Sequence, residues 1–338
     1  MRTGTLERYG RIWVPADAGA AKGYLARTLF VPHGRKERLG LMVSHIRPDE
    51  IAAVRLTDEG VPIDGRFAPV EIALSTIAPK NEAPRWVFVE DYEGGRGRAI
   101  VFLFAGANGA EPFAVVKVRT RGDGASLRRE RDALERIGTS SLRGTIPIVR
   151  GYREDGEREV LTLTSVRGAS MYREMATSLR PAALARLHFE RAGAWLERFQ
   201  AAAMGSHGDY WARNILVDGE SVSAVDWESF DDSSDQLDDV FHFPLTYALA
   251  FRWGSALPPA ERVRRAFGER NALSIAIAAW MRRFSEARGV SLDGLRRGFA
   301  EHLERGSEGA LERPLLEKTE WDAMAGEIRG GTPCAFSG

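Results

Sequence analysis

Residues 207–214 read His-Gly-Asp-Tyr-Trp-Ala-Arg-Asn, and residues 226–228 read Asp-Trp-Glu. These two short motifs place an Asp, an Asn and a second Asp at spacings that suit phosphoryl transfer. That reaction needs a carboxylate that orients the acceptor hydroxyl, oxygen ligands for magnesium, and a cation that binds the nucleotide phosphates. Asp209 is the candidate for the first role. Because magnesium takes hard oxygen ligands and keeps several waters, Asn214 and Asp226 suffice for the second.

The chain between the two motifs predicts a hairpin that brings them together. An Asp-Gly turn at 218–219 precedes the short apolar run 222–225, which has the composition of a strand. A hairpin there returns Asp226 to the side of Asn214. Glu228 follows two residues later, and it is either a candidate ligand for a second metal or its water, or a salt-bridged or solvated carboxylate.

The phosphate-binding cation has a candidate upstream. Lys117 lies in the apolar run 114–118, where an unpaired ammonium is costly to bury. Residues 126–137 follow with apolar positions at helical spacing. Glu130 on that helix is the natural partner of Lys117, and Glu135 is the second choice. The other interpretation of Lys117 is a lysine on the solvent-facing side of its strand.

Two further features have competing interpretations. Gly94, Gly95 and Gly97 lie between two predicted strands. Glycine has no Cβ, so backbone N–H groups in such a turn can approach phosphate oxygens closely, although the same residues also suit an ordinary tight turn. His207 resembles a zinc ligand only superficially, because no second His or Cys stands at ligand spacing. We expect it to pack in the core and to brace its loop.

Composition limits the class of protein. The 338 residues predict two domains, or one domain of two lobes. With 47 basic and 47 acidic residues the formal charge is zero, which argues against a general nucleic-acid or membrane-surface binder. The single cysteine, Cys334, cannot form an internal disulfide, which fits a reducing cytoplasm. No signal-peptide pattern opens the chain and no run approaches the roughly 20 apolar residues of a membrane span, so we expect a cytoplasmic protein.

The order of elements predicts an α+β chain with segregated lobes. The expected strands, which form a five-stranded, mostly antiparallel sheet with one helix after the third, are 86–89, 99–104, 113–118, 146–152 and 159–166. The expected helices of the second lobe are 181–204, 241–253, 259–284 (one or two), 292–305 and 315–329. We divide the chain into an N-terminal extension of unknown role (1–84), a nucleotide-binding lobe (85–168) and a helical lobe with the catalytic loop (169–338). Within the extension, residues 24–31 are β-like.

In this order the motifs resemble those of the aminoglycoside phosphotransferase and choline kinase family, a branch of the protein-kinase-like fold. The elements that carry the resemblance are the glycine-rich hairpin, Ala-Val-Val-Lys at 114–117, Glu130, His-Gly-Asp-x-x-x-x-Asn and Asp-Trp-Glu. Protein kinases have Arg where Gly208 stands, and usually Phe-Gly after the metal-binding Asp. Gly208 and Trp227 therefore favour the small-molecule branch. The resemblance covers residues 86–330 and implies a bilobal fold.

The family resemblance implies a role for each matched residue. Asp209 resembles the catalytic base, Asn214 and Asp226 the magnesium ligands, Lys117 the phosphate-binding lysine, and Glu130 its partner. ATP and magnesium are the implied cofactors.

Two supporting positions also follow from the resemblance. An Asp that anchors the catalytic loop from below is expected in the segment 237–241, where Asp239 is the better fit. The hinge that binds adenine through its backbone is expected near Thr164, Ser165 and Val166. The segment before residue 85 has no equivalent in the minimal fold, and it is expected to cap the nucleotide lobe, to mediate dimerisation or to bind a partner.

The implied activity is transfer of the ATP γ-phosphate to a hydroxyl of a small-molecule acceptor, such as a sugar, an aminoglycoside or an amino alcohol. We expect no nucleic-acid and no membrane partner. Two alternatives stay open: a catalytically weak, pseudokinase-like nucleotide-binding scaffold, and a kinase of proteins or peptides. The acidic run 231–235 either attracts a cationic acceptor or is a solvated loop.

Overall fold

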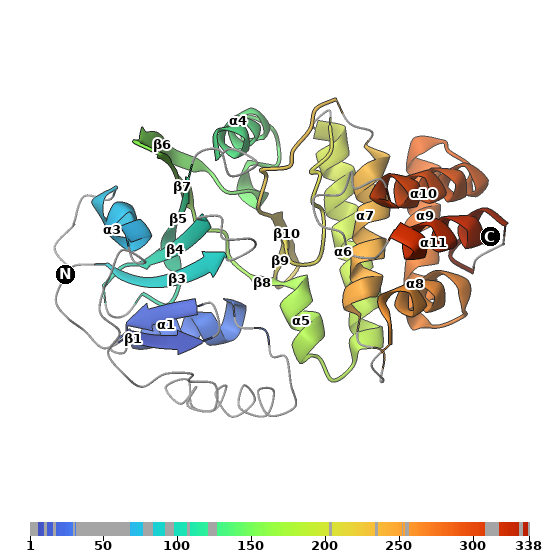
Figure 1. The fold of residues 1–338 in the computed structure, drawn as a ribbon, viewed down its shortest axis with the longest axis horizontal. Helices are drawn as coiled ribbons and strands as arrows, with labels where there is room; N and C mark the ends of the chain where they lie inside the picture. Colours follow the sequence, from blue (N-terminus) through green and yellow to red (C-terminus); the bar gives the residue numbers. More distant parts are fainter. Residues whose placement is uncertain are drawn as a thin grey trace.

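The protein is represented by a computed structural model. It describes residues 6–9, 12–15, 18–29, 31, 68–76, 84–91, 98–106, 109–120, 127–202, 205–233, 236–251, 253, 257–307, 318–330 and 334–336. The described elements form a mainly β lobe and a helical lobe, which lie at the left and right of Figure 1. This arrangement agrees with the predicted separation of strands and helices along the chain.

An antiparallel sheet of seven strands dominates the first lobe, in the order β1-β2-β3-β4-β5-β7-β6. The strands are β1 (Leu6–Tyr9), β2 (Ile12–Pro15), β3 (Arg85–Asp91), β4 (Arg98–Phe104), β5 (Pro112–Thr120), β6 (Val149–Asp155) and β7 (Arg158–Thr164). The predicted five-stranded sheet is thus corrected to seven strands. The reason is that β2 from the N-terminal segment pairs with β3, with Trp13 opposite Phe88, and β1 then pairs with β2.

A second correction concerns the β-like run that begins at Tyr24. The chain there forms α1 (Gly19–Tyr24) and a π-helix (Leu25–Leu29), not a strand. Ala21, Tyr24 and Leu25 are all buried, and this i, i+3, i+4 spacing is that of one helix face. The apolar residues that suggested a strand are therefore buried at helical spacing.

The two faces of the sheet are covered by different N-terminal elements (Figure 1). Side chains alternate along a strand, so neighbouring residues of β3 belong to opposite faces. Trp86 and Phe88 pack with Val70 of helix α3 (Ala68–Ser75). Val87 packs with the cluster formed by α1 and the π-helix. The described parts of the segment before residue 85 thus supply two strands at one edge of the sheet, β1 and β2, and a cover for each face.

The same alternation sets the direction of Lys117. Val116 and Val118 on β5 belong to the cluster beneath α3, so Lys117 between them points to the other face of the sheet. Helix α4 (Leu127–Ile137) follows β5, as predicted. It buries one face, on which Glu130 is the charged residue among apolar ones. The strand and the helix therefore direct a lysine and a glutamate to the same side.

The second lobe contains seven described α-helices and a small sheet. The helices are α5 (Met171–Thr177), α6 (Pro181–Ala202), α7 (Leu237–Ala250), α8 (Pro259–Gly268), α9 (Ala272–Arg288), α10 (Leu292–Ser307) and α11 (Lys318–Gly330). The sheet has the strand order β10-β9-β8, with β8 at Ala169–Ser170, β9 at Ile215–Asp218 and β10 at Ser221–Ala224. Gly219, with φ of +59°, turns the predicted hairpin between β9 and β10. The segment 259–284 divides into two helices, and Asn271 caps the second of them.

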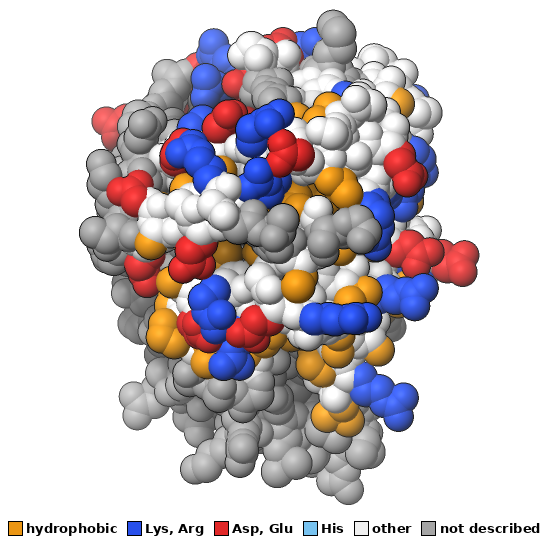
Figure 2. All heavy atoms as spheres, turned by 90° about the vertical axis from the view of Figure 1, so that its right-hand side faces the viewer, with side chains coloured by type: hydrophobic (Ala, Val, Ile, Leu, Met, Phe, Trp, Pro, Cys, Tyr) orange, Lys and Arg blue, Asp and Glu red, His pale blue; other side chains and the backbone are white. Residues whose placement is uncertain are grey.

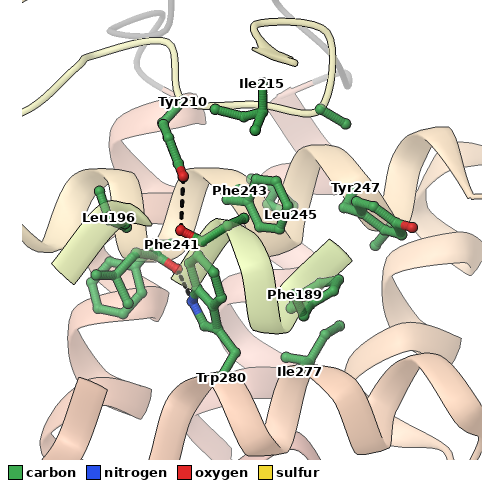
Figure 3. Packing of buried hydrophobic residues seen from close by; sticks show 14 of the residues in the cluster. Phe189, Leu196, Tyr210, Ile215, Phe241, Phe243, Leu245, Tyr247, Ile277 and Trp280 are labelled. Carbon is green, nitrogen blue, oxygen red and sulfur yellow. Dashed lines mark hydrogen bonds between the residues drawn. The ribbon is translucent and has the colours of Figure 1, made fainter. Parts of the chain in front are cut away.

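Aromatic side chains from several helices form the core of this lobe (Figure 3). Phe189, Phe243 and Trp280 lie in mutual ring contact, with centroid separations of 5.0 to 5.6 Å. Their polar neighbours are satisfied: the Trp280 indole N–H donates to the Val240 carbonyl at 2.8 Å, and the Tyr210 hydroxyl donates to the α6 backbone. The loop that carries Tyr210 is therefore anchored in the helical core.

The outer face of the helical lobe carries charges of both signs, which lie intermixed in Figure 2. Ion pairs such as Arg264 with Glu261 on α8 and Arg296 with Asp293 on α10 are of this kind. Within the part of the chain that the structure describes, no helix is long and apolar enough to cross a bilayer.

Candidate active site

Lys117 on β5 binds two carboxylates at once. Its Nζ atom lies 2.7 and 2.8 Å from the two oxygens of Glu130, and 2.6 Å from Asp226 Oδ1. Glu130 is fully buried on α4, whereas 13% of the Lys117 side chain is exposed. Glu135, the second choice for a partner, is exposed. The structure thus brings together the three predicted residues from the strand, the helix and the second motif.

The charges of Lys117 and Asp226 stabilise each other, whereas burial keeps the pKa of Glu130 above its usual value. Burial lowers the pKa of Lys117, but Asp226 and Glu130 raise it by more, so the pKa lies above its usual value. For Asp226 burial raises the pKa, and the nearby Lys117 ammonium more than reverses that effect, so this pKa lies below its usual value. Lys117 and Asp226 are therefore both charged at neutral pH and form a fixed ion pair between the lobes.

The Asp-Trp-Glu motif is held from both sides. Glu130 also accepts a hydrogen bond from the Trp227 backbone N–H at 3.3 Å, which connects α4 directly to the motif. The Trp227 side chain is fully buried and donates its indole N–H to the Ala224 carbonyl at 3.2 Å. Asp226 has a φ of +68°, in the left-handed region that Asp tolerates better than most residues. This turn of the backbone directs its carboxylate to Lys117.

Asp239 anchors the first motif from α7. Its carboxylate accepts the backbone N–H groups of His207 and Gly208 at 2.6 and 3.1 Å. Asp239 is buried, with an exposed fraction of 1%, and burial raises its pKa to about 7, although the two backbone N–H donors oppose that rise. The contact that the family resemblance implied for Asp239 is thus present.

Gly208 occupies a position that only glycine suits. Its φ is +79°, and a Cβ atom placed on it would collide with the carbonyl oxygen of Ser229. The backbone of the loop therefore passes directly against the segment that follows Asp-Trp-Glu. A larger residue at 208 would separate the two motifs.

His207 braces the loop from within the core, as expected. Its Nε2 atom lies 3.1 Å from the Val225 carbonyl, and its Nδ1 accepts the Asp209 N–H at 3.4 Å. This pair of contacts suits a neutral imidazole that carries its proton on Nε2. Burial lowers the pKa of His207 to about 4, so the ring is neutral at physiological pH.

Asp209 is the half-exposed carboxylate of the site. Its Oδ2 atom accepts a hydrogen bond from the Asn214 side-chain amide at 2.9 Å, and its backbone carbonyl accepts a second at 3.0 Å. His242 on α7 approaches from the other side, with Nε2 at 3.5 Å from Asp209 Oδ1. With 36% of its side chain exposed, Asp209 is held in orientation and still accessible.

The two candidate metal ligands flank the β9–β10 hairpin. The Val225 N–H donates to the Asn214 carbonyl at 2.9 Å, so the residue before Asp226 is tied to Asn214. Asn214 uses its amide NH₂ on Asp209, which leaves its side-chain oxygen as a donor atom for a cation. The described residues contain no cluster of three or more His, Cys, Asp or Glu side chains at ligand distances. One amide oxygen and one carboxylate fit a magnesium ion shared with phosphates.

Glu228 makes ion pairs in this structure. Its carboxylate lies 2.8 Å from Arg98 Nη2 and 3.5 Å from Arg119 Nη1. Of the two interpretations that the sequence left open, the ion pair is the one observed.

The glycine-rich residues and the predicted hinge residues complete the set that the sequence suggested. Gly94, Gly95 and Gly97 lie outside the described residues. Ser165 and Val166 are half-buried in the connection between β7 and β8, where the chain passes from the first lobe to the second.

Sequence reasoning missed three residues of the site: Arg98, Arg119 and His242. Arg119 had a usable signal, because it stands two positions after Lys117 on one strand and must share its face. Arg98 and His242 meet the motifs only through tertiary contacts, so local patterns did not identify them.

Comparisons with known proteins find likeness in structure alone. No protein-family model and no curated protein matches the sequence. Among solved structures, the aminoglycoside phosphotransferase APH(3'')-Id from Streptomyces rimosus matches 59% of this chain and 85% of its own, at 19% identity and a TM-score of 0.38. A type VIII aminoglycoside-3'-phosphotransferase matches 66% of this chain and 93% of its own, at 18% identity and a TM-score of 0.40.

A third match is vaccinia related kinase 3, over 47% of this chain and 54% of its own, at 16% identity and a TM-score of 0.32. At TM-scores below 0.5, the function has to be judged from the geometry of the site itself. Of the three solved structures named here, two are aminoglycoside phosphotransferases and one is a vaccinia related kinase.

Proposed function

We propose that this protein is an ATP- and magnesium-dependent phosphotransferase that moves the γ-phosphate to a hydroxyl group of a small molecule. One observation carries the proposal: Lys117, paired with Glu130, contacts Asp226 at 2.6 Å, and the hairpin that ends at Asp226 begins at Asn214, which binds Asp209. A phosphate-binding cation, two oxygen ligands and a half-exposed carboxylate are thus connected in one chain of contacts. These are the groups that phosphoryl transfer requires.

Each residue has a distinct task in this proposal. Lys117 binds nucleotide phosphates, and Glu130 fixes the position of its ammonium. Asn214 and Asp226 hold magnesium, which when bound neutralises phosphate charge. Asp209 accepts the proton of the acceptor hydroxyl and orients its oxygen toward the phosphate. Because catalysis of this kind consists mostly of positioning and charge stabilisation, a rigid loop matters as much as the carboxylate.

The braced state of the loop supports a working enzyme over a pseudokinase-like scaffold. Asp209 is fixed by Asn214 on one side and approached by His242 on the other, while Asp239 binds the two preceding backbone N–H groups. A scaffold that only binds nucleotide has no use for an accessible carboxylate held in this way. The proposed acceptors are a sugar, an aminoglycoside or an amino alcohol.

The variant Asp209→Asn tests the proposal. Asparagine has nearly the same shape but does not accept the proton, so turnover should fall by about a thousandfold while ATP affinity changes little. The assay measures magnesium-dependent ADP release across a panel of sugars, amino alcohols and aminoglycosides, and a nucleotide titration runs beside it. Unchanged turnover in this variant, or absence of ATP binding by the wild-type protein, contradicts the proposed function. Label from γ-labelled ATP that appears in protein would instead indicate a protein kinase.

A further inference from the structure

Glu228 lies two residues after Asp226, in the loop that carries this proposed magnesium ligand and that is called the metal loop below. It joins the metal loop to strands β4 and β5 of the large sheet. Arg98 Nη2 lies 2.8 Å from both oxygens of its carboxylate, and Arg119 Nη1 lies 3.5 Å from one of them. The exposed fractions of the side chains are 22% for Arg98, 3% for Arg119 and 10% for Glu228. These ion pairs are thus shielded from solvent, where an uncompensated charge is strongly unfavourable.

The strand register explains why a carboxylate is needed between the two arginines. Ala99 on β4 pairs with Val118 on β5, and the next position along this antiparallel register places Arg98 opposite Arg119. Like charges opposite each other destabilise a sheet. Burial and the nearby Arg98 both lower the pKa of Arg119, as expected for two guanidinium groups forced together. Glu228 supplies the negative charge that allows both to face the second lobe.

The positions of Arg98 and Glu228 in the chain indicate what their ion pair does. Arg98 is the first residue of β4, immediately after the glycine-rich segment that includes Gly97. Glu228 stands two residues after Asp226. An ion pair between them therefore fixes the start of β4 against the loop that carries a proposed magnesium ligand.

We propose that Glu228 is a positioning residue for Mg-ATP, which through Arg98 and Arg119 sets the position of β4 and β5 relative to the metal loop, and that it is not a metal ligand. This inference rests on the proposed function. Both oxygens of Glu228 are already engaged by Arg98 Nη2. A divalent cation bound there would have to displace a guanidinium and remain beside two positive charges.

A double-mutant cycle on Mg-ATP binding tests the inference without knowledge of the acceptor. The variants are Arg98→Gln, Glu228→Gln and the double variant, and the affinity for Mg-ATP is measured by calorimetric titration. Each single change should weaken binding by about tenfold, and the double variant should be no weaker than either single one. Arg98→Lys, which keeps the charge, should recover part of the affinity. Glu220→Gln, an exposed change on the β9–β10 turn, is the matched control and should bind as the wild type does.

The magnesium dependence separates a positioning residue from a ligand. The inference expects Arg98→Gln and Glu228→Gln to leave the magnesium concentration for half-maximal ATP binding within about twofold of wild type. A large increase in that concentration for Glu228→Gln alone would identify Glu228 as a ligand and overturn the inference. Additive losses of affinity, or wild-type affinity in both variants, would also overturn it while the proposed function stands. Failure of the wild-type protein to bind Mg-ATP would instead refute the proposed function, and thermal unfolding without nucleotide verifies that each variant is folded.

Discussion

Lys117 and Asp226 lie 109 residues apart in the chain and meet at 2.6 Å. Lys117 belongs to a central strand of the large sheet, and Asp226 follows the small hairpin of the helical lobe. Glu130 binds the same ammonium from α4, so three elements are fixed relative to one another by charge. The removal of Lys117 leaves the fully buried Glu130 carboxylate and the half-buried Asp226 carboxylate without their cation, and the first prediction depends on this.

Replacement of Lys117 by Met should lower both nucleotide affinity and stability. The change removes the cation and leaves Glu130 and Asp226 with unopposed negative charge, which should reduce the free energy of unfolding by about 3 kcal/mol. Urea denaturation measures the loss. Arg128→Ala on the same α4 helix is the control, because the Arg128–Glu154 pair is exposed and should contribute under about 1 kcal/mol. Equal losses in the two variants would contradict the importance assigned to the buried group.

The conformation of Gly208 should make Ala a damaging substitution. At φ of +79° an Ala is strained, and its Cβ also meets the Ser229 carbonyl, so Gly208→Ala should destabilise the protein by about 3 kcal/mol or more. Gly219 is the matched control: its φ is +59°, but a Cβ there meets no atom within 4 Å. Gly219→Ala should therefore lose only about 1 kcal/mol, from backbone strain alone. Similar unfolding midpoints for the two variants would refute the proposed close approach.

His207 should make the protein less stable in mild acid. Its pKa falls from 6.5 to about 4 on folding, so the unfolded chain binds a proton that the folded protein does not bind between these values. The stabilisation is present above pH 6.5 and is lost as the pH falls toward 4, and it amounts to about 3 kcal/mol in full. Denaturation at a series of pH values should show this slope in the wild type and a smaller one in His207→Gln. The same slope in both would assign the effect to another group.

The acidic run after Asp-Trp-Glu should have little influence on a cationic acceptor. Asp231 accepts hydrogen bonds from the Ser233 backbone N–H and hydroxyl, and Asp232 forms an ion pair with Arg136 of α4. Both carboxylates thus have internal partners, so Asp232→Asn should change the KM of a cationic acceptor by less than about twofold. Kinetics at low salt, where surface charge acts most strongly, measures this. A rise of tenfold or more would show that the run recruits substrate.

Much of the site follows from the sequence where a local rule applies. Helical spacing around Glu130 places it on the buried face of α4, and a turn signal at Gly219 returns Asp226 to Asn214. Strand alternation places Lys117 on the face opposite Val116 and Val118, but whether that face is covered does not follow from a local rule. The tertiary partners of Glu228 cannot be predicted from the sequence, because Arg98 is 130 residues away and its pairing depends on how the lobes meet.

The N-terminal strands were missed for a related reason. β1 and β2 are four residues each, too short to show a period, and the burial of β2 comes from an edge supplied by residues far along the chain. The run that begins at Tyr24 shows the opposite error. Its residues favour a strand locally, but packing against both lobes holds them in a helix.

The described part of the first 84 residues belongs to the folded unit. Trp13 on β2 is buried in one cluster with Trp86 and Phe88, and Arg173 of the helical lobe donates to the Ala26 carbonyl of the π-helix. A protein trimmed to begin at residue 85 would keep every motif named above, yet it would present β3 as a long, apolar, unpaired edge. Such an edge is a template for intermolecular pairing, so the trimmed protein should aggregate. The boundary suggested by the motifs is therefore unsuitable for expression of the motif-bearing part alone.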